Sequence, residues 1–220
     1  MDLDLLETTT SLSSSHRAFL DAMFSAQRAF VVVFAILAAL ASAAAFNQTL
    51  GASSECICTT APCPVSGVNH MTEGGGAQGT HNYVIHDGHA VVTSASVKIG
   101  PSNLDKGTDT TKCTQEYARS LDDDGTVDAD AGHILAHRLG GIGSQPINIF
   151  PQDLSVYRGA YAQFEAKIYE CIKGGASSAA LSWTFQYSSS KRTKPSKVTY
   201  DAAFTGGDCE NLSQSFDNGR

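Results

Sequence analysis

Residues 130–141 read DAGHILAHRLGG, and the fold expected for the chain follows largely from them. The glycines at 132, 140 and 141 favour a short strand that carries His133 and ends in a turn. Two stretches follow closely, NIFPQ at residues 148–152 and RGAYAQFE at residues 158–165. The second begins a run with apolar residues at three- and four-residue steps, which predicts an amphipathic helix over 159–174. We therefore expect a strand, a loop and a helix in direct succession.

Taken together, the three stretches resemble the DNA/RNA non-specific endonuclease family, a branch of the His-Me-finger (ββα-metal) nucleases. The Gly-His-Ile-Leu-Ala run is similar to that of its extracellular and toxin-type members, and the resemblance covers residues 113–204. It implies an α+β fold in which an antiparallel sheet carries a ββα-metal core. It also implies endonucleolytic cleavage of DNA and RNA with Mg²⁺ or Mn²⁺.

The resemblance also implies roles for individual residues. His133 is expected to be the general base, because a neutral imidazole with a pKa of about 6.5 can accept a proton from water. Asn148 and Glu165 are expected to arrange the hydration shell of the metal ion, since Mg²⁺ keeps several waters when it binds protein. Asp130 is expected to orient the loop around His133.

Two positions depart from the family pattern. Tyr157 stands where the family has a metal-binding asparagine, and a neutral phenol is a poor ligand for Mg²⁺. Three interpretations stay open: a catalytically impaired pseudo-nuclease that acts as a secreted binding protein, a metal held in a rearranged shell by Asn148, Glu165 or Asp153, and an allelic change. Ala131 stands where many members carry an arginine; the candidates to replace it are Arg138, which matches the motif best, Arg158 and Arg119.

Other basic and histidine groups have less specific patterns. We expect Arg158, Lys191 and Arg192 to contact the substrate, because the basic loop 191–197 offers local positive charge that the net charge of −7 lacks. His133 and His137 could instead bind zinc from a helix, but the glycines around them favour a strand. The group His81, His86 and His89 is interpreted as the surface of a hairpin.

The flanking segments predict further elements. Residues 84–99 predict a hairpin turning at Asp87-Gly88, and residues 181–187 and 197–204 predict two strands with Trp183 in the core. Residues 46–80 are rich in Cys, Thr, Pro and Gly and predict an irregular segment, so we place the nuclease-like domain at 81–220. The acidic stretch 121–130 predicts a solvated loop, with calcium binding as the weaker alternative.

The N-terminal region indicates export. Arg28, the apolar run 29–46 and the small residues at 41–45 are typical of a secretory signal, here residues 1–45, with Met23 as an alternative start. We expect a secreted protein without stable membrane association; a signal-anchored ectodomain is the alternative, because the run approaches the roughly 20 residues that span a bilayer. The six cysteines then predict three disulfides whose pairing the sequence leaves open.

Overall fold

The structure is a computed structural model that describes residue 58, residues 61–123 and residues 129–218; for Tyr157 and Arg158 it describes only the backbone. The chain divides into two units, Met1–Gly51 and Ala52–Arg220, and only the second contains described residues. The predicted signal sequence therefore lies outside the described residues. Within the described part, no helix is both long enough and apolar enough to cross a lipid bilayer.

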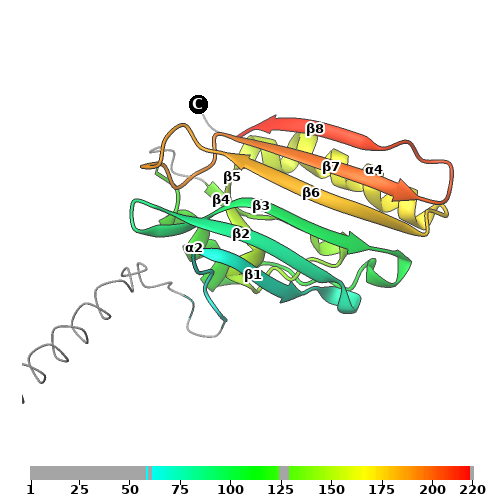
Figure 1. Cartoon of the computed structure of the whole chain (residues 1–220), viewed down its shortest axis with the longest axis horizontal. Coiled ribbons are helices and arrows are strands. Elements are labelled where there is room, and N and C mark those ends of the chain that lie inside the picture. The colour runs from blue at the N-terminus through cyan, green and yellow to red at the C-terminus, as the bar shows by residue number, and fades with distance from the viewer. Residues whose placement is uncertain (1–57, 59–60, 124–128, 219–220) are drawn as a thin grey trace, which may run out of the picture. The chain divides into compact units, whose positions relative to one another are not determined.

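Six antiparallel strands form the main sheet, in the order β1-β2-β3-β6-β7-β8 (Figure 1). Inward-facing residues alternate with exposed ones along the central strands, as expected of a sheet with one buried face. In β6 the buried residues are Ala179, Leu181, Trp183 and Phe185. The strands are β1 Gly67–Thr72, β2 Gln78–His86, β3 His89–Ile99, β6 Ser178–Gln186, β7 Lys197–Thr205 and β8 Leu212–Asp217.

The buried face of the sheet packs against a second layer, which comes between β3 and β6 in the chain. Its central part is a two-stranded antiparallel pair, β4 Ala129–His133 with β5 Ile149–Asp153, followed by helix α4 Ala162–Lys173. In Figure 1 this helix lies behind β6, β7 and β8, and Phe164, Ile168 and Ile172 join the sheet residues in one core. The shorter elements are η1 Gly74–Gly76, η2 Pro101–Asn103, α2 Lys112–Ser120, η3 His137–Leu139, η4 Pro146–Asn148, α3 Leu154–Val156 and the π-turn η5 Tyr157–Tyr161.

Most of the predicted elements are confirmed. The protein is α+β with an antiparallel sheet, and β4, β5 and α4 form the ββα succession that the family resemblance implied. Residues 149–153 form the strand β5, where the residue pattern alone had indicated a loop. The hairpin of β2 and β3 turns at Asp87 and Gly88, whose φ angles of 46° and 81° suit a tight two-residue turn. Trp183 is 2% exposed, as predicted for a core residue.

Two predictions were wrong. Residues 67–80 are not irregular, because β1 and the start of β2 lie there and pair along their length, so a boundary at residue 80 would cut β2. His81 is not on the surface of the hairpin: it is 2% exposed, because its side chain lies on the buried face of β2.

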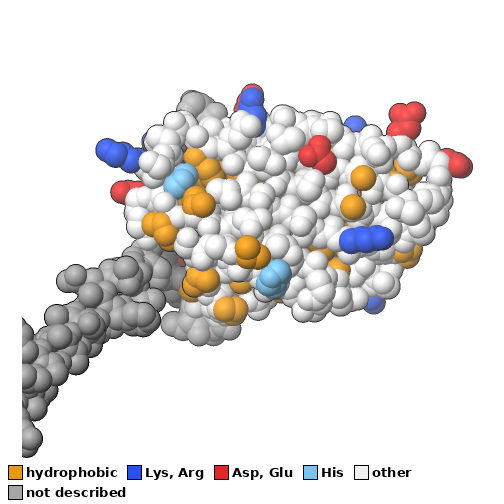
Figure 2. All heavy atoms as spheres, in the orientation of Figure 1, with side chains coloured by type: hydrophobic (Ala, Val, Ile, Leu, Met, Phe, Trp, Pro, Cys, Tyr) orange, Lys and Arg blue, Asp and Glu red, His pale blue; other side chains and the backbone are white. Residues whose placement is uncertain are grey.

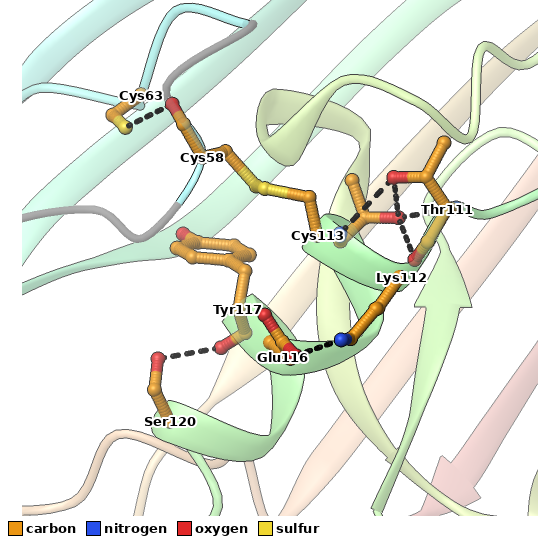
Figure 3. Close-up of a disulfide and its surroundings, with 9 residues drawn as sticks. Cys58, Cys63, Thr111, Lys112, Cys113, Glu116, Tyr117 and Ser120 are labelled. Atoms are coloured by element: carbon orange, nitrogen blue, oxygen red, sulfur yellow. Dashed lines mark hydrogen bonds and ion pairs between the residues drawn. A yellow bond between two sulfur atoms is a disulfide. The ribbon is translucent and has the colours of Figure 1, made fainter.

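Disulfides link loops to helices in two places. Cys58 is bonded to Cys113 in the first turn of α2, beside the ring of Tyr117 (Figure 3). Cys171 in α4 is bonded to Cys209, which precedes β8. Cys63 is disulfide-bonded as well, so Cys58 and Cys63 are not available for a zinc knuckle.

Candidate active site

His133 is the last residue of β4 and is 8% exposed. Its Nε2 lies 3.1 Å from the carbonyl oxygen of Thr108. Since a carbonyl oxygen only accepts hydrogen bonds, Nε2 must carry the proton, and Nδ1 of the neutral ring is then the basic atom. Burial lowers the pKa of His133 below its ordinary 6.5, and the neighbouring His137 adds to this, while Thr108 and Asp109 oppose it. The ring is therefore neutral and able to accept a proton at pH 7.

A glycine-rich loop holds the Thr108 carbonyl in place. Gly143 N–H donates to this oxygen at 3.1 Å, and Thr108 N–H donates to the carbonyl of Gly141 at 3.0 Å. Position 143 has no room for a side chain: a Cβ there would collide with His133 Nε2 and lie 2.7 Å from the oxygen of Thr108. The glycines after His133 thus allow the close approach that fixes the imidazole.

His133 lines a pocket of about 610 Å³, together with groups from three other segments. Glu165, in the first turn of α4, is half-buried and lines the same pocket. Desolvation raises the pKa of Glu165 to about 8, although the positive charge of Arg138 acts in the opposite direction. A carboxyl group with so high a pKa is one that a bound cation would stabilise in its charged form. The pocket is lined by Asp105, Asp109, His133, Ala136, His137, Arg138, Tyr161, Ala162 and Glu165.

The rim of this pocket consists of paired charged groups. His137 Nδ1 lies 2.9 Å from a carboxylate oxygen of Asp109. The zinc alternative needed His133 and His137 on one helix and is not supported, because His133 ends the strand β4 and His137 begins the separate 3-10 turn η3. The guanidinium of Arg138 stacks on the ring of Tyr169, 5.5 Å from the centroid. The hydroxyl of Tyr169 donates to Asp105 at 2.7 Å. Arg138 is exposed at the rim, where a phosphate group can reach it.

Asn148 is completely buried and lies outside the pocket lining. Its amide oxygen accepts from Leu135 N–H at 2.8 Å, and its amide nitrogen donates to the Leu135 carbonyl at 3.0 Å. The side chain therefore ties the loop before β5 to the segment after His133. Asn148 therefore positions the backbone near His133, and both its amide oxygen and its amide nitrogen are already engaged in hydrogen bonds with Leu135.

Asp130 and Asp153 also lie away from the pocket. Asp130 is three residues before His133 on β4, so its side chain leaves the opposite face of the strand, and it pairs in register with Gln152. The carboxylate of Asp153 accepts from both the backbone and the hydroxyl of Ser155, which fixes the turn into α3. Neither carboxylate lines the pocket with Glu165.

Tyr157, which departs from the family pattern, begins the π-turn Tyr157–Tyr161, and this turn leads directly into α4. Such turns within helices occur frequently at functional sites. The backbone of Tyr157 and Arg158 belongs to this turn, and their side chains are outside the described atoms. Tyr161, at the end of the turn, lines the pocket and accepts a hydrogen bond from Trp183 at 3.1 Å.

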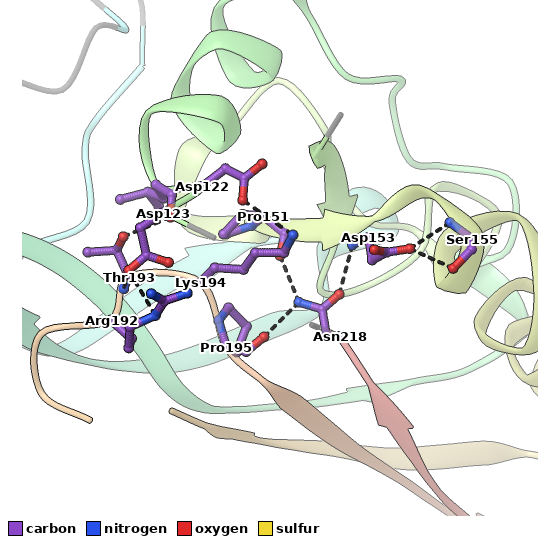
Figure 4. Close-up of polar contacts among 11 residues, drawn as sticks. Asp122, Asp123, Pro151, Asp153, Ser155, Arg192, Thr193, Lys194, Pro195 and Asn218 are labelled. Atoms are coloured by element: carbon purple, nitrogen blue, oxygen red, sulfur yellow. Dashed lines mark hydrogen bonds and ion pairs between the residues drawn. The ribbon is translucent and has the colours of Figure 1, made fainter. Parts of the chain in front are cut away.

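In the basic loop 191–197, Arg192 and Lys194 form ion pairs with acidic residues (Figure 4). Arg192 Nε lies 3.4 Å from a carboxylate oxygen of Asp123, and Lys194 Nζ lies 3.3 Å from Asp122 with both side chains buried. Neither Lys191 nor Arg192 lines the pocket. Arg192 and Lys194 therefore pair with the described start of the acidic stretch 121–130, whose residues 124–128 are outside the described part, while Lys197 pairs with Asp217.

Several residues of the site were not singled out from the sequence. Thr108 and Asp109 belong to a segment without a motif, and only the structure brings them to His133. Glu73 is further away in the chain and contacts the same loop through Ile142 N–H at 3.1 Å. The glycines at 141 and 143 were the one available signal, because a glycine-rich turn next to a candidate base indicates close packing.

A family model of the DNA/RNA non-specific endonucleases matches residues 71–203 of the chain. The chain belongs to this family. The match includes β4, the glycine-rich loop, β5 and α4, and thus the whole pocket around His133.

Individual similarities accompany the family match. The chain is 35% identical over 121 residues to a Dickeya dadantii (strain 3937) protein named probable deoxyribonuclease RhsA; this covers 55% of the chain and 8% of that protein. Among solved structures, NucA from Streptococcus agalactiae with magnesium bound has a TM-score of 0.46 at 11% identity, covering 70% of this chain and 83% of NucA. The metal-free form of NucA has a TM-score of 0.46 at 12% identity, covering 73% and 84%.

Proposed function

We propose that this endonuclease-family chain hydrolyses phosphodiester bonds in DNA and RNA without selecting the sugar, with His133 as the general base and a divalent metal ion as cofactor. The observation that carries the proposal is the bond between His133 Nε2 and the Thr108 carbonyl. It leaves Nδ1 as the proton acceptor of a neutral ring that lines a pocket with Glu165.

In this mechanism, His133 Nδ1 takes a proton from the water that attacks the phosphorus atom. The imidazolium that forms keeps its Nε2–H bond to Thr108, and the charge of Asp109 helps to stabilise it. Arg138, exposed at the rim, contacts a phosphate oxygen and offsets part of the negative charge that grows during attack. As the bond between phosphorus and the 3′ oxygen breaks, the leaving oxygen takes a proton from solvent, and the proton held by His133 then returns to solvent.

The pocket fits a hydrated divalent ion. Among the described residues there is no cluster of three or more His, Cys, Asp or Glu side chains suited to hold a metal ion, so a closed protein cage is absent there. Mg²⁺ and Mn²⁺ need fewer protein ligands, because they keep waters and take oxygens from the substrate phosphate. The desolvated carboxyl of Glu165 would hold such an ion through its waters. The ion would stabilise the charge on the phosphate and on the leaving oxygen.

Tyr157 favours a second candidate function, a nuclease scaffold that binds nucleic acid without cutting it. The two candidates differ in a nicking assay on supercoiled plasmid and on single-stranded RNA, with Mg²⁺ or Mn²⁺ and with EDTA. We expect the wild-type protein to cut both substrates only with metal, and His133→Ala to be inactive. A wild-type protein that is inactive but gains activity on Tyr157→Asn would establish the pseudo-nuclease instead.

We propose further that the protein acts outside the cell after removal of residues 1–45. The support is the signal-like N-terminus and the disulfides, Cys58–Cys113 and Cys171–Cys209 among them, since disulfides persist in oxidising compartments. N-terminal sequencing of the exported protein should begin near residue 46. An intact apolar run 29–46 in membrane fractions would favour the signal-anchored form.

A further inference from the structure

Glu73 is a buried carboxyl group outside the pocket, directly after β1, and is 3% exposed. One of its oxygens accepts from Ile142 N–H at 3.1 Å. The next residue, Gly74, donates its N–H to the carbonyl of Gly140 at 2.8 Å. Residues 73 and 74 thus hold the 140–143 loop at two points.

This loop is the one that fixes His133. Gly143 follows Ile142 directly, donates to the Thr108 carbonyl and packs against His133 Nε2 so closely that a Cβ would not fit. A shift of Ile142 would therefore move the Gly143 N–H and, with it, the carbonyl that holds the imidazole. One peptide unit separates the contact of Glu73 from the contact with the base.

The other oxygen of Glu73 is buried and has no hydrogen-bond partner among the described residues. A titratable side chain that faces it is His81 of β2, whose Nδ1 is also buried without a partner. A Cβ on Gly79 would lie 3.0 Å from the ring of His81 and 3.4 Å from this oxygen of Glu73, so both groups flank the same glycine. A Cβ on the adjacent Gly74 would meet the backbone carbonyl of Lys106, whose side chain is exposed.

Burial sets the protonation of these two groups. Desolvation raises the pKa of Glu73 to about 7, with the Ile142 bond opposing it, and lowers the pKa of His81 to about 4, aided by His70. Glu73 therefore changes charge near neutral pH, while His81 stays neutral. A carboxylate accepts a hydrogen bond more strongly than a protonated carboxyl does.

We propose that Glu73 is a positioning residue of the nuclease site, which holds Ile142 and Gly143 so that the Thr108 carbonyl keeps His133 in its Nε2–H form. The inference rests on the proposed function, in which His133 Nδ1 is the base. Loosening the loop lets the imidazole turn or exchange tautomers, and both lower the fraction of molecules with Nδ1 aimed into the pocket. Substrate contacts at the rim are unaffected, so the turnover rate falls and KM does not.

The tautomer of His133 can be read without any activity. We would record ¹⁵N–¹H spectra of the imidazole rings in the whole exported protein, with the His133 signals assigned by their loss in His133→Gln. The wild-type protein should show a protonated Nε2 and an unprotonated Nδ1. In Glu73→Leu, which removes the acceptor but keeps similar bulk, the two tautomers should mix; Glu73→Gln, which keeps an acceptor oxygen, should retain the wild-type signals.

Kinetics with plasmid and Mg²⁺ provide the second readout. For Glu73→Leu we expect kcat to fall about 10²-fold with KM within about twofold, the size of effect that a misplaced catalytic group produces. Glu73→Gln should stay within about fivefold of the wild type at pH 7.5 and lose the inflection near pH 7 in the kcat profile of the wild type. Glu116→Gln, the same substitution on the exposed side of α2, should change nothing.

The outcomes separate the two proposals. If the wild-type protein cuts no nucleic acid, the proposed function fails, and the ring spectra still decide whether Glu73 positions His133. An unchanged tautomer in folded Glu73→Leu overturns the inference. If Glu73→Leu does not fold, an inflection near pH 7 that persists in Glu73→Gln overturns it.

Discussion

The protein has two hollows of nearly equal size on different sides of the main sheet. One, of about 610 Å³, contains His133; the other, of about 630 Å³, lies on the outer face of the sheet that Figure 2 shows. The outer hollow is lined by small and uncharged side chains, with Lys98 and Asp201 as its charged residues. The His133 pocket has seven titratable side chains within nearly the same volume. Size therefore does not distinguish the two hollows, and the chemistry of the lining does.

The largest effect on nuclease activity is expected when the general base, His133, is removed. His133→Ala should lower kcat/KM on plasmid DNA about 10³-fold, since general-base catalysis contributes factors of this order. The protein should keep its fold, because His133 is at the end of a strand and only one hydrogen bond is lost. A residual activity near that of the wild type would show that the catalytic base lies elsewhere.

The buried carboxyl of Glu73 should make the unfolding free energy of the protein depend on pH. Its pKa is raised from 4.5 to about 7, so between these pH values the folded protein binds more protons than the unfolded chain, and Glu73 makes folding less favourable as the pH rises. Glu73→Gln removes this dependence, and its unfolding free energy relative to the wild type should increase by about 3 kcal/mol from pH 4 to pH 8.

Urea titrations at both pH values measure this difference. The opposite contribution of His81, whose pKa is lowered, is present in both proteins and cancels in the comparison. A difference that is independent of pH would mean that the Glu73 carboxyl titrates normally in the folded protein.

Crowding at Gly143 should disturb the His133 pocket without removing any catalytic group. Gly143→Ala forces a Cβ against His133 Nε2 and the Thr108 carbonyl, so kcat should fall about 10²-fold. Gly100→Ala is the matched control, because its Cβ would meet only the backbone oxygen of Ser177, at 3.1 Å, and Gly100 does not line the pocket. Equal effects of the two substitutions would indicate a general loss of stability.

The smallest effect is expected in the outer hollow. Lys98→Ala should leave kcat/KM within about twofold of the wild type, because exposed charges contribute little at physiological salt. The same plasmid assay at 0.15 M salt measures it. A tenfold or larger fall in kcat/KM would indicate that the substrate binds at the outer face of the sheet, and would contradict the assignment of the active site to the His133 pocket.

The sequence predicted those helices and strands in which buried residues recur at regular steps, every second residue in a strand or every three to four residues in a helix. The alternation along β6, the stripe of α4 and the turn at Asp87-Gly88 are local signals, and each is confirmed. β1 and β8 were not predicted, because both are edge strands with few apolar residues, and their pairing with β2 and β7 decides their conformation.

The candidate site was predictable where a motif named the residue. His133, Arg138 and Glu165, which the family resemblance named, line one pocket. Thr108, Glu73 and the backbone role of Asn148 depend on contacts between segments far apart in the chain, which no local pattern records. The ion pairs of Arg192 and Lys194 could not be predicted for the same reason, since their partners Asp123 and Asp122 lie about 70 residues earlier.

The most direct test of the His133 pocket as the nuclease site is a crystal structure of His133→Ala with a short DNA duplex and Mn²⁺, with the ion located by its anomalous scattering. We predict one strong peak in the pocket, next to Glu165, with a phosphate of the duplex beside it and near Arg138. An ion and duplex bound in the outer hollow, or a duplex bound elsewhere with no ion near Glu165, would contradict the account.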